Sequence, residues 1–319
     1  MSVRITPPAE FGLRPEAPLA PLTTLAIGGN SRWLLELRDP GLLDTAWNWA
    51  RSQGLPVLFL GAGSNVLFSD AGYDGLVIRN RLRGRERAGN EVRVSGGEDL
   101  GETIRWVNRL GLAGMERLYG IPGTVAGAVV GNAGAYGQEI GDRIREVSFW
   151  SPEQGVTTLP ASDLDFRYRH SRFKERREWF LLSCTLALEA ASEPLQPVSD
   201  QILATRLAKY PVGLKCPGSF FKNVIADELD PQGLSRIPED FIFYGKIPAG
   251  KLLDEVGARG RRMGGALIAS HHANLFVNEE GAASRDMLAL ARKYSNRVRE
   301  KFDIELEPEI LIVSPNQWR

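Results

Sequence analysis

Residues 120–137, which read GIPGTVAGAVVGNAGAYG, constrain the fold more than any other stretch of the chain. More than half of the stretch is glycine or alanine, and none of its side chains carries a charge. Glycine is kept where φ must be positive or where another group approaches the main chain closely. The polar residues Thr124, Asn132 and Tyr136 interrupt the run, whereas a flexible linker would be richer in Ser, Lys or Glu. One interpretation is a loop joined to a tightly packed helix. The other, which we favour, is a main-chain surface moulded to a large flat ligand.

The size and charge of the chain limit the class of protein. At 319 residues it is long enough for two domains, or for one domain and a subdomain. Its 39 basic and 39 acidic side chains give a formal net charge of zero, which argues against a generally basic nucleic-acid binder. No window approaches the roughly 18 apolar residues of a membrane span, and the N-terminus lacks a basic segment followed by an apolar one. We therefore expect a cytoplasmic protein.

Cysteine and histidine are too scarce for a convincing metal centre. The two cysteines, Cys184 and Cys216, lie far apart and lack the spacing of metal ligands. The three histidines, His170, His271 and His272, are too few and too scattered. We expect reduced thiols and no bound metal.

Apolar periodicity predicts a mixture of helices and strands. Proline-rich residues 1–21 are expected to form an extended arm. A helix is predicted to open at Asp99, which Glu102 follows three residues later in a pattern like a capping box. The other expected helices follow Asp39 and lie around 200–209 and 248–256, and the expected strands lie at 32–37, 56–60, 75–79, 91–95, 145–150, 155–159 and 180–188.

The composition changes near residue 190, where prolines predict a passage between domains at about residue 195. Beyond it, a long amphipathic helix is expected to be capped by Ser284. The last predicted strand, 304–313, places isoleucine and leucine on one face and glutamate on the other.

A glycine turn follows the predicted strand 56–60 and reads G-A-G-S-N at residues 61–65. A strand followed by G-x-G suggests a Rossmann dinucleotide site, but Val66 stands where the third glycine is required. The Rossmann fingerprint therefore fails. Two interpretations stay open, an ordinary tight turn and a nest of main-chain N–H groups that binds an anion with help from Ser64 and Asn65.

Four segments in this order resemble one family: G-A-G-S-N-V-L at 61–67, the run at 120–137, Y-R-H-S-R-F-K at 168–174, and G-S-F-F-K-N at 218–223 with L-E-P-E-I at 306–310. The family is UDP-N-acetylenolpyruvoylglucosamine reductase, and the resemblance covers roughly residues 23–313. It implies an α+β fold, with an FAD-binding domain of the vanillyl-alcohol-oxidase type in two subdomains and a C-terminal α+β substrate-binding domain. We place the domains at 1–195, with a subdomain boundary near 82, and at 196–319.

The same resemblance implies an enzyme of peptidoglycan precursor synthesis. NADPH would reduce a non-covalent FAD, and hydride would then pass to UDP-N-acetylglucosamine enolpyruvate to give UDP-N-acetylmuramate. A tether through histidine in the first half of the chain is impossible, since no histidine precedes His170. The implied partners are the UDP-sugar and NADPH, with no nucleic acid, membrane span or obligate protein partner. The spacing before residue 216 resembles the shorter subgroup, which lacks a tyrosine-bearing insertion.

Three catalytic residues are implied by the motif matches. Arg169 would stabilise charge on the enolpyruvyl carboxylate, because a guanidinium stays charged and forks onto carboxylate oxygens. Glu309 would act near the same carboxylate. Ser219 would give a proton to the carbon next to the one that receives hydride. Without the resemblance to this family, the alternative interpretations are that Arg169 is a surface charge, that Ser219 is a turn residue and that Glu309 is a charge on an edge strand.

The remaining predicted site residues fall into two groups. The cofactor-binding set is Gly61, Ala62, Gly63, Ser64, Asn65, Leu67, Ile121, Pro122, Gly123, Thr124, Gly127, Ala128, Asn132, Gly134, Ala135, Tyr136 and Gly137. The substrate-binding set is Tyr168, Lys222, Asn223, Lys251 and His272. Two alternative functions are a flavin-dependent oxidase of an alcohol or hydroxy acid on the same fold, and a non-catalytic nucleotide-binding module. The module leaves the charged segments 218–223 and 306–310 unexplained.

Overall fold

The computed structural model describes residues 12–315 and 317–318. The chain divides into two compact units, each built from segments that are distant in sequence. Unit 1 comprises residues 12–17, 31–63 and 74–208, and unit 2 comprises residues 18–30, 64–73 and those from 209 onward. The predicted assignment of a cofactor domain to 1–195 and a substrate domain to 196–319 stays a prediction.

The first sheet of unit 1 has the strand order β1-β2-β5-β3. Its strands are β1 (Arg14–Pro18), β2 (Asn30–Leu37), β3 (Val57–Leu60) and β5 (Tyr73–Asn80), and β3 runs parallel to β5. Helix α1 (Leu43–Ser52) packs on this sheet through buried Leu43, Ala46 and Ala50. The predicted arm is therefore wrong for residues 14–18, which form an edge strand, and its residues 1–11 lie outside the described part of the chain.

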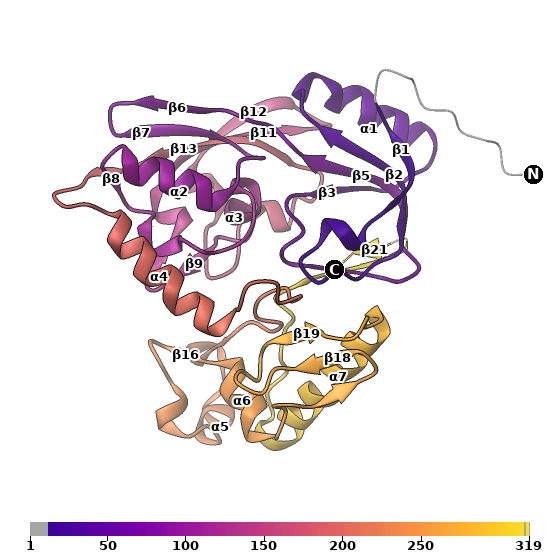
Figure 1. Ribbon diagram of the computed structural model, residues 1–319, viewed down its shortest axis with the longest axis vertical. Coiled ribbons are helices and arrows are strands. Elements are labelled where there is room, and N and C mark those ends of the chain that lie inside the picture. The colour runs from indigo at the N-terminus through magenta and orange to yellow at the C-terminus, as the bar shows by residue number, and fades with distance from the viewer. Residues whose placement is uncertain (1–11, 316, 319) are drawn as a thin grey trace, which may run out of the picture. The chain divides into compact units, whose positions relative to one another are not determined.

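The second sheet of unit 1 is antiparallel, in the order β12-β11-β13-β7-β6. Its strands are β6 (Arg85–Ala88), β7 (Glu91–Ser95), β11 (Ile144–Ser151), β12 (Gly155–Pro160) and β13 (Phe180–Ala187). Helices α2 (Leu100–Arg109) and α3 (Val125–Val130) lie on one side of it, as Figure 1 shows. Fully buried Ile104 and Val129 from these helices meet buried sheet residues such as Val94 and Phe149 in one core. The predicted subdomain boundary near 82 lies in the connection between the two sheets.

Smaller elements complete unit 1. They are β8 (Leu112–Ala113) paired with β14 (Glu189–Ala190), β9 (Gly134–Ala135) paired with β10 (Gln138–Glu139), and α4 (Gln196–Lys209). The glycine-rich run is thus a loop followed by a short packed helix and a hairpin, so the alternative interpretation of its local structure is correct.

Unit 2 contains two three-stranded sheets and one pair of short strands. The sheets are β21-β20-β4, made of β4 (Val66–Phe68), β20 (Leu311–Ser314) and β21 (Gln317–Trp318), and β17-β18-β19, made of β17 (Arg262–Met263), β18 (Ala266–Ile268) and β19 (Phe276–Asn278). The pair is β15 (Val224–Ile225) with β16 (Lys246–Ile247), and the helices are α5 (Pro231–Ser235), α6 (Ala249–Glu255) and α7 (Ser284–Phe302). Strand β4, directly after the G-A-G-S-N turn, runs parallel to β20. Asn65, directly before β4, accepts a hydrogen bond from Leu311 N of β20 at 3.0 Å through its main-chain oxygen.

Single helical turns occur in both units. They are Ala20–Leu22, Pro40–Leu42, Glu116–Leu118, Ile140–Arg143, Ala161–Leu164, Arg172–Lys174, Ala226–Glu228 and Glu239–Phe241.

Two predictions for unit 2 need correction. Ser284 does not cap α7 with its hydroxyl, because Asp70 Oδ2 accepts hydrogen bonds from both Ser284 N (2.8 Å) and Ser284 Oγ (2.7 Å). The last strand begins at Leu311 and not at residue 304. Residues 304–310 keep the predicted alternation of buried and exposed side chains but form a single isolated bridge, between Phe221 and Pro308, and Pro308 has no N–H to continue a ladder.

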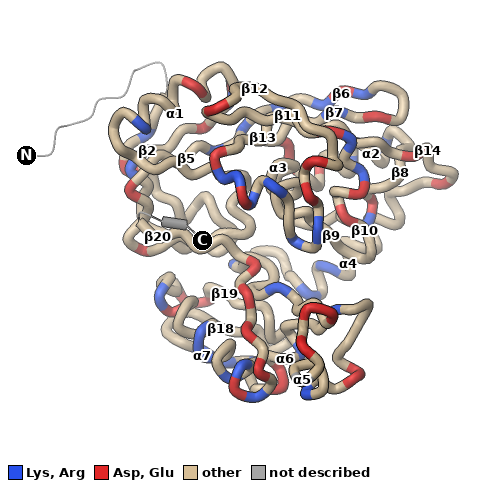
Figure 2. Tube along the Cα trace, turned by 180° about the vertical axis from the view of Figure 1, so that it is seen from behind, with Lys and Arg blue, Asp and Glu red and all other residues tan. Residues whose placement is uncertain are grey.

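Charged residues of both signs are interspersed along each unit, as Figure 2 shows. Among the described residues, no helix has the length and apolar character needed to cross a membrane.

Candidate functional site

The glycine turn after β3 touches the glycine-rich run inside unit 1. A Cβ atom on Gly61 would lie 2.6 Å from Thr124 Oγ1, so only glycine fits at position 61 without movement. Thr124 is the N-cap of α3, and its Oγ1 accepts a hydrogen bond from Gly127 N at 3.2 Å. Arg79, which donates to Gly61 O at 3.3 Å, holds the turn from the sheet side. The two small-residue segments therefore form one continuous main-chain surface.

Main-chain donors remain available in the turn. Gly63 is buried with φ of +69°, and the N–H groups of Ala62 and Gly63 donate no hydrogen bond within residues 12–315. Two consecutive N–H groups next to a left-handed residue form a nest that suits a phosphate. This favours the anion-binding interpretation of G-A-G-S-N over an ordinary turn.

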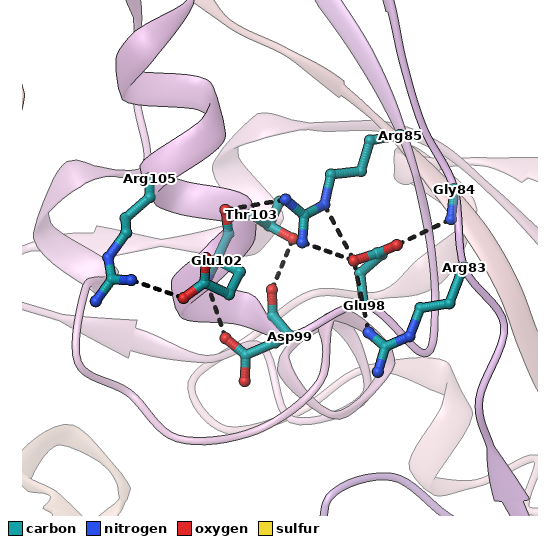
Figure 3. Close-up of polar contacts among 8 residues, drawn as sticks. All are labelled: Arg83, Gly84, Arg85, Glu98, Asp99, Glu102, Thr103 and Arg105. Atoms are coloured by element: carbon teal, nitrogen blue, oxygen red, sulfur yellow. Dashed lines mark hydrogen bonds and ion pairs between the residues drawn. The ribbon is translucent and has the colours of Figure 1, made fainter.

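The buried carboxylate of Glu98 holds in place the segment that precedes α2 and contacts the first residue of α3. Glu98 Oε1 accepts from Gly84 N (2.9 Å) and Oε2 accepts from Arg85 Nη2 (2.6 Å), with Arg83 at 3.5 Å (Figure 3). Burial alone would raise the pKa of Glu98, but these donors outweigh it and hold the pKa below its usual value. The main chain of Glu98 in turn accepts from Val125 N at 2.9 Å. The ion pair therefore supports the entry into α3.

The segment that contains Tyr168 and Arg169 packs against the glycine-rich run. These two residues form the tip of a tight turn closed by Arg167 and His170, and Arg169 has a φ of +54°. The Arg169 guanidinium donates to Gly134 O at 3.3 Å and lies 5.2 Å from the centre of the Tyr168 ring. Arg169 is thus held beside residues predicted to bind the cofactor.

The side chain of Asn132 makes hydrogen bonds within unit 1. It is almost fully buried, its Oδ1 accepts from Gly141 N (3.0 Å), and its Nδ2 donates to Glu139 Oε2 (2.7 Å) and Arg167 O (3.0 Å). Its side chain therefore ties the glycine-rich run to the Arg169 turn, and its main-chain N–H donates to Val129 O at 3.2 Å.

In unit 2, residues 219–222 run between two other extended segments. Ser219 forms a bridge with Leu275 on one side, and Phe221 forms a bridge with Pro308 on the other. Glu309 N donates to Phe220 O at 2.8 Å. The structure therefore brings the Ser219 and Glu309 segments together, although their motifs lie almost 90 residues apart in the sequence.

A pocket of about 280 Å³ in unit 2 gathers four of the predicted residues. Its lining includes Ser219, Asn223, Lys251 and His272, together with Lys209 and Arg259. Ser219 is half-buried, and its hydroxyl makes no hydrogen bond within the described part of the chain. The pocket combines a hydroxyl donor with three cationic side chains and one carboxylate, that of Asp254, which pairs with Arg259 at 2.5 Å. The excess of positive charge suits an anionic ligand.

Several lining side chains are already oriented by neighbours. Asn223 Oδ1 accepts from Ala249 N at 3.2 Å. Lys251 Nζ donates to Asp240 O at 2.7 Å and lies 4.3 Å from the centre of the Phe243 ring. Lys222, outside this pocket lining, pairs with Glu307 at 2.5 Å.

His272 is kept uncharged by its surroundings. Burial, followed by the positive charges of Lys209, His271 and Arg259, lowers the pKa of His272 to about 4. Its Nδ1 accepts a hydrogen bond from Asn274 N at 3.2 Å. At neutral pH His272 is therefore a hydrogen-bonding group and not a cation.

Sequence reasoning missed three residues of this region. Lys209 ends α4 and Arg259 lies in a turn after α6, and no local pattern distinguishes either from ordinary surface charge. Asn274 is buried, with both side-chain groups bonded to the main chain of Phe221. An asparagine within the apolar run that follows His272 was the one usable signal, because a buried amide must be satisfied.

Asp165, His170 and Glu175 place possible metal-ligating atoms within 4.8 Å of one another. Both carboxylate residues are exposed, at 3.5 and 3.3 Å from His170 Nε2. The arrangement is that of a surface ion-pair cluster, and the expectation of no metal stays a prediction.

Comparison with known proteins defines the class and the family. A family model described as "FAD binding domain" matches residues 33–159, and one described as "UDP-N-acetylenolpyruvoylglucosamine reductase, C-terminal domain" matches residues 210–313. The chain is thus an FAD-binding protein of the α+β class. A UDP-N-acetylenolpyruvoylglucosamine reductase from Solibacter usitatus (strain Ellin6076) is 38% identical over 297 residues, which cover 93% of this chain and 95% of the relative. The chain belongs to the UDP-N-acetylenolpyruvoylglucosamine reductase family.

Two further matches agree. A reductase of the same name from Synechococcus sp. (strain JA-3-3Ab) is 39% identical over 300 residues, 93% of this chain and 89% of the relative. The crystal structure of UDP-N-acetylenolpyruvylglucosamine reductase from Thermus caldophilus matches with a TM-score of 0.71 and 29% identity, over 94% of this chain and 98% of that chain. The predicted family, fold class and FAD cofactor are confirmed, and the oxidase and non-catalytic alternatives are not favoured.

The residues of unit 1 fit FAD. The free N–H groups of Ala62 and Gly63 suit a phosphate of the cofactor, and the contact between Gly61 and Thr124 keeps side chains out of the surface between the turn and α3. The individual cofactor, substrate and catalytic assignments stay predictions.

Proposed function

We propose that the chain reduces UDP-N-acetylenolpyruvoylglucosamine to UDP-N-acetylmuramate in the cytoplasm, with NADPH as the reductant of its bound FAD. The observation that carries this proposal is the Ser219 hydroxyl, which has no hydrogen-bond partner in the described part of the chain and lines a cationic pocket. Family membership over 93% of the chain supports the choice of substrate. In this proposal the partners are these small molecules, and none is a nucleic acid or a protein.

FAD held by the main-chain surface of residues 61–65 and 120–137 would supply the hydride for reduction of the enolpyruvyl group. An enol ether is a poor hydride acceptor, so negative charge that develops toward the substrate carboxylate must be stabilised. We assign this role to Arg169, whose guanidinium is held next to the glycine-rich run by Gly134 O. Glu309 acts on the same carboxylate.

Ser219 completes the reaction by giving a proton to the neighbouring carbon. Hydride and proton together add the two hydrogens that convert the carbon–carbon double bond to a single bond. A serine hydroxyl is a weak acid in water, so this role requires a strongly basic intermediate and a fixed hydroxyl. The bridge from Ser219 to Leu275 and the buried ring of Phe220 support such fixation.

The cations of the unit 2 pocket would hold the substrate's diphosphate. Lys251 is oriented by Asp240 and Phe243, and Arg259 is oriented by Asp254 at 2.5 Å. Oriented cations bind phosphate with less loss of side-chain entropy than mobile ones. This supports a nucleotide diphosphate as the ligand of the pocket.

The test is Ser219→Ala in the FAD-loaded protein, followed by anaerobic stopped-flow absorbance. Reduction of the flavin by NADPH should proceed at the wild-type rate, since no proton from Ser219 is needed. Reoxidation by the enolpyruvyl substrate should slow by roughly 100- to 10,000-fold, the usual contribution of a general acid.

Ser295→Ala is the matched control, because Ser295 lies on α7 with its hydroxyl bonded to Arg292 O. Equal slowing of both half-reactions in Ser219→Ala would remove the proton-donor role. Normal reoxidation would do the same.

A further inference from the structure

We propose that Arg79 acts through the Gly61–Ala62 peptide group to direct the N–H of Ala62 at a phosphate of FAD. Arg79 is then a positioning residue, because its side chain contacts the main chain of the glycine turn and needs no contact with the cofactor. The inference rests on the proposed cofactor-binding role of Ala62 and Gly63, and it does not depend on the identity of the substrate.

The first sheet of unit 1 places Arg79 directly beside the glycine turn. Strands β3 and β5 run parallel, and Arg79 of β5 is the register partner of Leu60, the residue before the turn. The Arg79 side chain is only 13% exposed, and its Nε donates to Gly61 O at 3.3 Å. The guanidinium is thus packed against the first peptide group of the turn.

The carbonyl of Gly61 and the N–H of Ala62 belong to one planar peptide group. This peptide is trans, so its C=O and N–H bonds point in opposite directions. Since Gly61 O faces Arg79, the N–H of Ala62 points away from the guanidinium, where no group of residues 12–315 accepts it. A hydrogen bond to the carbonyl also polarises the peptide group and makes its N–H a stronger donor.

Thr124 restricts the same glycine from another element. A Cβ atom on Gly61 would lie 2.6 Å from Thr124 Oγ1, and this oxygen is itself fixed because it accepts from Gly127 N. With its carbonyl held by Arg79 and its α-carbon packed against Thr124, Gly61 leaves the following peptide plane little freedom to rotate. The N–H groups of Ala62 and Gly63 therefore stay next to each other as a nest.

Glu36 orients the guanidinium of Arg79. Glu36 Oε1 accepts from Arg79 Nη1 at 3.4 Å and from Arg81 Nη2 at 3.3 Å, and Arg14 and Arg38 lie 3.9 and 3.8 Å from the same carboxylate. Four guanidinium groups thus share one carboxylate, and the cluster stays positively charged when one of them is removed. What the other arginines do not replace is the hydrogen bond from Arg79 to Gly61 O.

The experiment measures the dissociation constant of FAD, from the flavin fluorescence released when the FAD-loaded protein is diluted. In Arg79→Met a methyl group takes the position of Nε, so the bond to Gly61 O is lost and FAD should bind roughly 10-fold more weakly, the effect of about one hydrogen bond. Arg79→Gln carries an uncharged N–H donor as far along the side chain as Nε, and its affinity should stay within about 3-fold of wild type.

Arg81→Met is the matched control. It removes a guanidinium from the same Glu36 cluster and keeps the bond between Arg79 and Gly61, so FAD affinity should stay within about 3-fold of wild type. An amide spectrum of the FAD-loaded protein gives a second readout. The Ala62 amide proton should move upfield in Arg79→Met, because its bond to the phosphate weakens, and should keep its position in Arg79→Gln and Arg81→Met.

The outcomes separate the inference from the proposed function. If Arg79→Met and Arg79→Gln lose the same affinity, if Arg81→Met loses as much as Arg79→Met, or if all variants bind FAD as well as wild type, the donor role is overturned and the proposed function stands. An Ala62 amide that does not respond to Arg79→Met also overturns it. If wild-type protein binds no FAD at all, the proposed function itself fails.

Discussion

At the scale of single residues, His272 binds a proton less readily in the folded protein than in the unfolded chain. Its pKa is about 4 in the folded protein against 6.5 for an ordinary histidine. Between these two pH values the unfolded chain binds a proton that the folded chain does not bind. The free energy of unfolding should therefore fall as the pH is lowered from 6.5 toward 4, and this contribution should be fully present above pH 6.5.

Denaturant unfolding of wild type and His272→Gln at several pH values between 4 and 7.5 measures this effect. Glutamine does not titrate, so the difference in stability between the two proteins should shift in favour of the variant as the pH decreases. A difference that stays constant across the range would show that His272 has an ordinary pKa.

Tyr244 is held in a backbone conformation that its side chain disfavours. It has a φ of +50°, it is fully exposed, and it precedes Gly245 in a hairpin turn closed by two hydrogen bonds between Phe243 and Lys246. Left-handed backbone costs a residue with a Cβ about 1 kcal/mol, and asparagine tolerates it better.

Tyr244→Asn should therefore stabilise the protein by up to about 1 kcal/mol, visible as a rise of roughly 2 °C in the unfolding temperature. Tyr244→Phe keeps the Cβ and the aromatic ring and should leave the unfolding temperature unchanged. A loss of stability in Tyr244→Asn would mean that the tyrosine ring contributes more than the backbone strain costs.

At the scale of elements, the contact between the glycine turn and the start of α3 is steric. In Gly61→Ala the new methyl group would lie 2.6 Å from Thr124 Oγ1, and the turn and the helix must separate. We expect this variant to lose stability and to bind FAD more weakly. Thr124→Ala alone should cost about 1 kcal/mol through loss of the helix cap.

The double variant Gly61→Ala/Thr124→Ala tests the cause. Removal of Oγ1 leaves the nearest remaining Thr124 side-chain atom 3.8 Å from the new methyl group, so the two changes should compensate in part. Thermal unfolding and flavin release report the four proteins of the cycle. Strict additivity would mean that the clash does not determine the effect of Gly61→Ala.

Local sequence patterns predicted most of the helices and strands, but they did not predict every contact at the ends of these elements. Asp99 accepts from Glu102 N at 2.8 Å, as the spacing of the two residues predicted. The helix expected at Ser284 does begin there, but its capping group could not be predicted in the same way, because Ser284 N donates to Asp70, more than 200 residues earlier. The last strand was predicted to be longer than it is. The alternation of apolar and charged residues predicts which side chains are buried, but it does not predict which residues pair with another strand.

The site could be predicted where its residues lie in motifs and not elsewhere. Ser219, Asn223, Lys251 and His272 were all named from the sequence and line one pocket. Lys209 and Arg259 were not, since their place in the pocket depends on how α4 and α6 end. The main-chain donors of Ala62 and Gly63 were anticipated as a nest, but only the three-dimensional structure shows that no other group in the described chain uses them.

At the scale of the whole molecule, the proposed cofactor surface lies in unit 1 and the proposed diphosphate pocket lies in unit 2. Family membership extends over 93% of the chain and so covers most of both units. Segments 18–30 and 64–73 belong to unit 2 although they lie within the first third of the sequence. Truncation at the predicted domain boundary would therefore separate β20 from β4 and should not give a correctly folded fragment.

The most direct test of the central claim is an anaerobic stopped-flow measurement on the intact FAD-loaded protein. The flavin is first reduced with NADPH and then mixed either with UDP-N-acetylenolpyruvoylglucosamine or with buffer alone. We predict that the absorbance of oxidised flavin returns with the enolpyruvyl compound and that UDP-N-acetylmuramate forms in equal amount. Flavin that stays reduced with this compound and is reoxidised only when dioxygen is admitted would contradict the account.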